Sequence, residues 1–120
     1  MATEVHTIEK WDEMCRQADA TNVPCILQIG SDACVKCPAV TDAINECDKA
    51  YLFTRAYSNA HNPDNELVDE FSISKLPSVV MYNPRYPDCI FKRQSVEPTQ
   101  VTQEISNSCK PKDLTFDESF

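Results

Sequence analysis

Two cysteines three positions apart, directly after an apolar run, constrain this chain more than any other feature of its sequence. The run Cys25-Ile26-Leu27-Gln28-Ile29 contains one polar residue, which is typical of a short central strand covered on both faces. A tight loop from Gly30 to Ala33 then leads to Cys34-Val35-Lys36-Cys37. The sequence therefore predicts a buried strand that delivers two thiols to the start of a helix.

The position of the two cysteines suits thiol–disulfide chemistry. Thiols at positions i and i+3 of one helical turn lie close enough to close a small disulfide ring. A helix N-terminus offers partial positive charge and unpaired N–H groups, which favour an anion such as the thiolate of Cys34. Because the thiolate is the reactive form of cysteine, this placement favours Cys34 as a nucleophile. Pro38 follows immediately, so the helix should bend in its first turn or begin late.

Composition limits the other possibilities. A chain of 120 residues, of which 42% are hydrophobic, fits one compact domain with a real core. The net charge of -8 disfavours nucleic acid and anionic membrane surfaces as partners. Residues 1–6 have no signal-peptide character, and no apolar run approaches a membrane span of ~20 residues. We expect a soluble, cytoplasmic protein that is a monomer or a weak dimer.

The remaining cysteines carry less information. The chain has seven, an odd number, and in a reducing compartment most of them should be thiols. Cys89 and Cys109 could form a second disulfide, although free thiols are the favoured interpretation. A zinc site would need two more ligands, but no second pair with this spacing exists and His6 and His61 stand alone. We therefore predict no metal site and assign neither histidine a role.

The order of elements along the chain predicts an α/β fold. A mixed sheet of four to five strands, flanked by about four helices, should occupy residues 1–112. The acidic tail at 113–120 is expected to be a solvating end, with docking to a basic partner as its alternative. Outside the strand and helix at the cysteine pair, the expected elements are a strand at 5–6, a helix capped by Thr7 and ending near 21–22, a strand at 51–57, a helix opening at Asn62-Pro63, a strand at 78–82, a return strand at 89–92 and a helix from Pro98.

Taken together, these features resemble the thioredoxin family over nearly the whole chain. The resemblance depends on the apolar strand before Cys34-Val35-Lys36-Cys37 and on Leu76-Pro77 before the strand at 78–82, about forty residues later. It implies the thioredoxin fold and a disulfide oxidoreductase in which Cys34 attacks, Cys37 resolves, and Pro77 is a cis-proline facing the pair. It also implies that the backbone of Leu76, with Val35 and Lys36, contacts an extended substrate.

The same resemblance implies the cofactors and partners. No bound cofactor is expected, because the redox group would be the Cys34–Cys37 disulfide itself. Substrates would be protein thiols or disulfides, and a flavin reductase or a sulfhydryl oxidase would recycle the pair. The direction of electron flow depends on the reduction potential of the pair against that of the compartment.

Two departures from the family pattern affect the expected chemistry. Val35-Lys36 replaces Gly-Pro, and the cation of Lys36, together with the helix terminus, should lower the pKa of Cys34 and make the disulfide a stronger oxidant by tens of millivolts. Gln28 stands where thioredoxins place a buried aspartate. Because glutamine cannot take a proton at neutral pH, resolution by Cys37 should be slow.

Other functions stay open on the sequence alone. Gln28 and Ala33, which replaces the family's tryptophan, favour an interaction module that keeps the fold with weak or no redox turnover. The cysteine pair and Pro77 favour the oxidoreductase. A glutathione-linked, glutaredoxin-like enzyme is a third possibility. The N-terminal strand and helix favour the thioredoxin side instead.

Overall fold

The structure is a computed structural model that describes residues 3–88 and 90–112. The predictions made for Cys89 and for the acidic tail at 113–120 lie outside the described residues. No helix within the described ranges is both long and apolar enough to cross a membrane.

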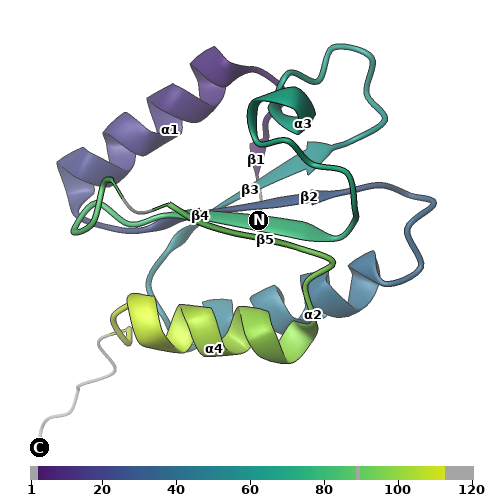
Figure 1. Ribbon diagram of the computed structural model, residues 1–120. Helices are drawn as coiled ribbons and strands as arrows, with labels where there is room; N and C mark the ends of the chain where they lie inside the picture. Colours follow the sequence, from purple (N-terminus) through teal and green to yellow (C-terminus); the bar gives the residue numbers. More distant parts are fainter. Residues whose placement is uncertain (1–2, 89, 113–120) are drawn as a thin grey trace, which may run out of the picture.

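A five-stranded mixed sheet forms the centre of the molecule, as predicted (Figure 1). The strands lie in the order β1-β3-β2-β4-β5, with β3 parallel to both β1 and β2, and β4 antiparallel to both β2 and β5. The apolar strand before the cysteines is therefore central. The strands are β1 (Thr3–Glu4), β2 (Cys25–Gly30), β3 (Thr54–Asn59), β4 (Ser78–Tyr82) and β5 (Phe91–Gln94).

Two pairs of helices cover the two faces of this sheet. Helices α1 (Ile8–Thr21) and α3 (Leu67–Glu70) lie on one face, and α2 (Cys37–Asp48) and α4 (Pro98–Ser108) lie on the other (Figure 1). Each face has its own buried cluster. Trp11 and Leu67 belong to the first cluster, and Ile44 and Ile105 belong to the second. Burial of apolar side chains on both faces explains why β2 is almost wholly apolar.

Alternation along β2 fixes which face each side chain takes. Cys25, Leu27 and Ile29 pack into the cluster under α1, whereas Ile26 packs into the cluster under α2 and α4. Since successive side chains of a strand point to opposite faces, Gln28 shares the α2 face with Ile26. The one polar residue of the strand is thereby placed beneath the start of α2.

The helix ends follow from local sequence. The Thr7 hydroxyl caps α1 by accepting from the backbone N–H of Lys10 at 3.1 Å, as predicted. Helix α2 begins late, at Cys37, with Pro38 in its first turn. A proline is tolerated there because first-turn N–H groups have no partner inside the helix. Cys34 therefore lies in the turn before the helix, where its carbonyl accepts from Cys37 N at 3.3 Å.

Three predicted strands have shifted ends. The strand expected at 51–57 begins at Thr54, because the chain before it is bound to the segment after α4: Leu52 N donates to Lys110 O at 2.8 Å. Similarly, β1 covers Thr3–Glu4 rather than 5–6, and the return strand covers Phe91–Gln94.

The helix predicted to open at Asn62-Pro63 is wrong, because α3 begins only at Leu67. The Asn62 side chain instead accepts from the backbone of Asp64 at 2.8 Å, which closes a turn. The Asn65 side chain accepts from the N–H groups of Leu67 and Val68 and so caps the helix that follows. Asparagine favours both arrangements, and the sequence pattern alone did not distinguish them.

Candidate functional site

Cys34 and Cys37 form a disulfide at the start of α2. Their Cα atoms are 5.4 Å apart, within the usual range for a disulfide. The two cysteines differ in exposure: Cys34 is partly exposed, whereas only 6% of Cys37 is. An incoming thiol or disulfide therefore reaches Cys34 first.

The peptide bond between Leu76 and Pro77 is cis, as expected. Leu76 lies beside Cys34 in one surface hollow, while Pro77 is buried next to the start of β4. Within residues 3–88 and 90–112, neither backbone group of Leu76 makes a hydrogen bond. This backbone is therefore available to an extended peptide that approaches Cys34.

Gly30, the only glycine of the chain, fits closely against the buried sulfur. A Cβ atom placed on Gly30 would lie 2.9 Å from Cys37 Sγ and 3.5 Å from Cε1 of Tyr57. The glycine does not have a positive φ, so its backbone conformation does not require it. The close approach of the sulfur requires it instead.

Gln28 is hydrogen-bonded beneath Cys37. Its side chain is 5% exposed, and Nε2 donates to Thr41 Oγ1 at 2.9 Å and to the carbonyl of Cys37 at 3.4 Å. The Thr41 hydroxyl lies 3.2 Å from both Gln28 Oε1 and Cys37 O, and can donate to either. This network fixes the first turn of α2 but contains no group that takes a proton at neutral pH.

Two hollows of opposite charge flank the disulfide, and both are lined by Ser31 and Cys34. The larger one, about 770 Å³, contains the carboxylates of Glu4, Asp32 and Asp42, and we call it the acidic hollow.

The smaller one, about 360 Å³, contains Lys36 and His61 and no carboxylate, and we call it the basic hollow.

Tyr57 also lines the acidic hollow, together with Cys34 and Cys37. Burial raises the pKa of its phenol, and the charges of Asp32 and Glu4 raise it further. The phenol of Tyr57 therefore stays neutral at neutral pH in this hollow, and Tyr57 is paired in register with Gln28 of β2.

Comparison with known proteins identifies the architecture. No family model matches the sequence, and no curated protein matches it either. Solved structures do. A thioredoxin from Plasmodium falciparum superposes with a TM-score of 0.72 at 13% identity, covering 91% of this chain and 88% of that one. The chain has a thioredoxin fold.

Two further structures agree with this assignment of the fold. Thioredoxin O1 from Arabidopsis thaliana, in its oxidized state, gives a TM-score of 0.69 at 14% identity over 91% of this chain and 98% of that one. Thioredoxin from Fasciola hepatica gives 0.71 at 11% identity over 88% and 98%. At such identities the comparison establishes the thioredoxin fold, and the chemistry has to be argued from the residues of this chain.

The thioredoxin fold brings together most of the residues singled out in the sequence. Val35, 92% exposed, and Lys36 border the basic hollow with Cys34 and Leu76, while Gln28 lies beneath Cys37.

The sequence analysis gave no site role to Arg55, Tyr57 or His61, all of which line the two hollows. Strand alternation could have found the first two, because 55 and 57 share a face and lie beside 26 and 28 of β2.

The other cysteines of the described chain are held as thiols away from the disulfide. Burial raises the pKa of Cys109 to about 12 and, with nearby Cys25, that of Cys15 to about 12; it also raises the pKa of Cys25. Such thiols are unreactive at neutral pH. Within the described ranges, no three His, Cys, Asp or Glu side chains gather as a metal site would require.

Proposed function

We propose that this chain is a thiol–disulfide oxidoreductase that acts on protein disulfides and dithiols through Cys34 and Cys37. One observation carries the proposal: the two sulfurs are bonded at the start of α2, with Cys34 accessible and Cys37 buried. This asymmetry suits a two-step exchange, in which one sulfur meets the substrate and the other waits behind it. The pair itself is the redox group, and no bound cofactor is needed.

The reduced pair would act in two displacements. The Cys34 thiolate attacks one sulfur of a substrate disulfide, so that the substrate S–S bond breaks and a mixed disulfide forms. The departing substrate thiolate takes a proton. Cys37 loses its proton to water and attacks Cys34 Sγ as thiolate; the bond between Cys34 and the substrate breaks, and the second substrate sulfur leaves as thiolate and takes up a proton. Two electrons pass to the substrate and the cysteine pair becomes a disulfide; the reverse sequence oxidises a substrate dithiol.

Three neighbours support these steps. Lys36 occupies the N-cap position of α2, where its charge and the helix N-terminus favour the Cys34 thiolate. The free backbone of Leu76 offers hydrogen bonds to an extended substrate segment. Gln28 cannot accept the proton of Cys37, so the second displacement is the slow step and mixed disulfides with substrate persist.

The alternative function is an interaction module of thioredoxin fold with weak or no redox turnover. Gln28 beneath Cys37 and Ala33 before Cys34 are the observations that favour it. Under this alternative the chain binds partners at the hollows around Cys34 without completing the exchange.

Reduction of insulin disulfides by a dithiol-recycled protein distinguishes the two functions. The oxidoreductase should accelerate the reaction, and Cys34→Ser should abolish the acceleration. Cys109→Ser is the matched control, since it removes a buried thiol away from the disulfide and should leave the rate unchanged. An unaccelerated reaction with the intact chain would overturn the proposal in favour of the interaction module.

A second measurement, the reduction potential of the Cys34–Cys37 pair, distinguishes the two possible classes of recycling partner. A value near −270 mV suits a reductase such as a flavin enzyme, whereas a value near −120 mV suits a sulfhydryl oxidase. Equilibration with glutathione buffers, followed by acid quenching and alkylation, gives this potential directly.

A further inference from the structure

The two hollows beside Cys34 differ in sign although they share two lining residues. Glu4, Asp32 and Asp42 place three carboxylates in the acidic hollow, whereas the basic hollow has Lys36 and His61. A substrate cysteine bonded to Cys34 would therefore have carboxylates on one side and the cation of Lys36, with the imidazole of His61, on the other. The attacking sulfur lies on the boundary between them.

Arg55 does not cancel the charge of the acidic hollow. The Arg55 guanidinium also lines that hollow, but its NH1 atom lies 3.8 Å from Asp48 Oδ2. The negative charge of Asp48 therefore offsets part of the positive charge of Arg55. The side chain of Arg55 is 12% exposed and that of Asp48 is 32% exposed, so solvent screens this ion pair only in part, and Asp48 Oδ1 also lies 3.8 Å from Lys112 Nζ. Carboxylates thus outnumber the cation on this side of Cys34.

His61 is held at the basic hollow by a loop with its own hydrogen bonds. The Asn59 side chain accepts from His61 N at 3.0 Å, and the loop closes where Asn62 N donates to Asn59 O at 3.1 Å. Asn65 Nδ2 donates to Asn59 O at 2.7 Å and to Ser58 Oγ at 2.6 Å. These bonds fix the loop between β3 and α3 in place.

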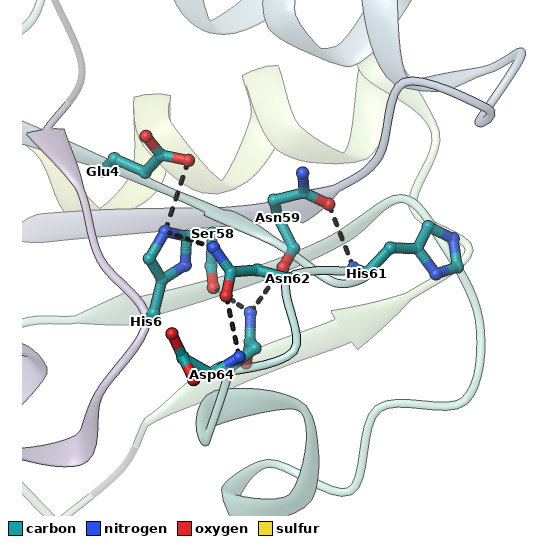
Figure 2. Close-up of polar contacts among 8 residues, drawn as sticks. Glu4, His6, Ser58, Asn59, His61, Asn62 and Asp64 are labelled. Atoms are coloured by element: carbon teal, nitrogen blue, oxygen red, sulfur yellow. Dashed lines mark hydrogen bonds and ion pairs between the residues drawn. The ribbon is translucent and has the colours of Figure 1, made fainter.

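Figure 2 shows the consequence for the two histidines. The ring of His61 points away from His6, which lies on the opposite side of the loop beside Glu4 and Asn62. His61 is therefore turned outward, toward the hollow that it shares with Cys34 and Leu76.

We propose that the site selects substrate segments by the order of charges around their reactive cysteine. An acidic side chain would lie in the basic hollow, near Lys36 and His61, and a basic side chain would lie in the acidic hollow, near Asp32 and Asp42. This inference rests on the proposed function and narrows its substrates to extended segments in which the cysteine lies between opposite charges.

Recognition by charge order fits the overall charge of the chain. A net charge of -8 repels an acidic partner at long range and attracts a basic one whatever its sequence. Two hollows of opposite sign add a preference that does not depend on the net charge of the partner. They distinguish two segments of the same composition, which is a test of specificity rather than of affinity.

The test uses two synthetic peptides of identical composition. One has glutamate two positions before its cysteine and lysine two positions after it; the other has these two residues exchanged. Each cysteine is activated as a pyridyl disulfide, and the reduced protein attacks it with release of thiopyridone, which absorbs light. Because both peptides meet the same thiolate and have the same net charge, the ratio of their two rates reports charge order alone.

One charge order should react about two- to tenfold faster, as expected for two exposed ion pairs. The double variant Lys36→Gln, His61→Gln should bring the ratio close to one, whereas His61→Lys, which places a second lysine in the same hollow, should not reduce it. Lys49→Gln removes one lysine charge, as Lys36→Gln does, but at the far end of α2. It should leave the ratio unaltered.

Three results would overturn the inference. Equal rates for the two peptides would show that charge order is not recognised. A ratio that survives in the double variant would show that the basic hollow is not its origin. If neither peptide releases thiopyridone faster than with the Cys34→Ser variant, the proposed function itself fails and the inference fails with it.

Discussion

Substitution of the only glycine tests how closely the oxidised site is packed. Gly30→Ala would place a Cβ atom 2.9 Å from Cys37 Sγ, whereas ordinary contacts of carbon begin near 3.5 Å. The sulfur would have to withdraw by about 0.6 Å. Its bond to Cys34 and its place in the first turn of α2 restrict that movement. Overpacking of this kind costs about 1–3 kcal/mol.

The cost should fall mainly on the disulfide form. In the dithiol form Cys37 is free to turn about its Cα–Cβ bond, and its sulfur can leave the new methyl group. Destabilising the disulfide relative to the dithiol by about 1–3 kcal/mol raises the reduction potential by about 20–65 mV, since 30 mV corresponds to about 1.4 kcal/mol. Equilibration of Gly30→Ala and the parent chain with glutathione buffers measures this shift.

A second background separates the sulfur contact from other effects of the methyl group. With Cys37→Ala the sulfur is absent, and the remaining contacts of the new Cβ, 3.5 Å to Tyr57 and 3.6 Å to the Cβ of residue 37, are ordinary ones. In that background Gly30→Ala should raise the free energy of unfolding by about 0.4–1 kcal/mol, because it restricts the unfolded chain. An unchanged or lowered potential in the parent background would refute the reasoning.

Three further substitutions test the neighbours of the disulfide and one buried thiol. Lys36→Gln removes a cation from the α2 N-terminus and should lower the reduction potential by about 5–20 mV, with Lys49→Gln unchanged in the same titration. Gln28→Asp places a proton acceptor beneath Cys37 and should raise insulin-reduction turnover; an unaltered turnover would contradict the assigned slow step. Burial raises the pKa of Cys109 from 9.0 to about 12, so its contribution to stability is complete below pH 9 and is lost as the pH rises toward 12. The urea midpoint should therefore fall less steeply between pH 9 and 11 in Cys109→Ala than in the parent chain, and parallel slopes would exclude this linkage.

Much of the fold could be predicted because the residues that mark helix starts and the pattern of apolar residues indicate the same elements. The apolar run at 25–29 is typical of a central strand between two layers of helices, and β2 is buried in that position. Thr7 and Pro98 mark helix starts by their capping and backbone chemistry, and both were correct. The element order and the cysteine pair followed from the same kind of pattern, whereas the cis bond before Pro77 was implied by the resemblance to the thioredoxin family.

The start of α3 was predicted wrongly because an asparagine side chain can either cap a helix or close a turn. Asn62 before a proline resembles a helix cap, but its amide closes a turn, and Asn65 caps α3 three residues later. The choice depends on Asn65 also reaching Ser58 and Asn59, which are contacts across the loop that no local pattern encodes. The position of His61 depends on the same loop, so its place beside Cys34 could not be read from the sequence.

Two separate features of the chain favour reaction at a single pair of thiols. Burial keeps Cys15, Cys25 and Cys109 protonated at neutral pH, so these thiols exchange slowly even though the described chain holds them unpaired. At the pair the opposite conditions hold, since Cys34 is accessible at the end of a helix dipole. Oxidation of the chain by a small disulfide should therefore close the pair without scrambling Cys15, Cys25 or Cys109. A high cysteine content is then compatible with one defined redox couple.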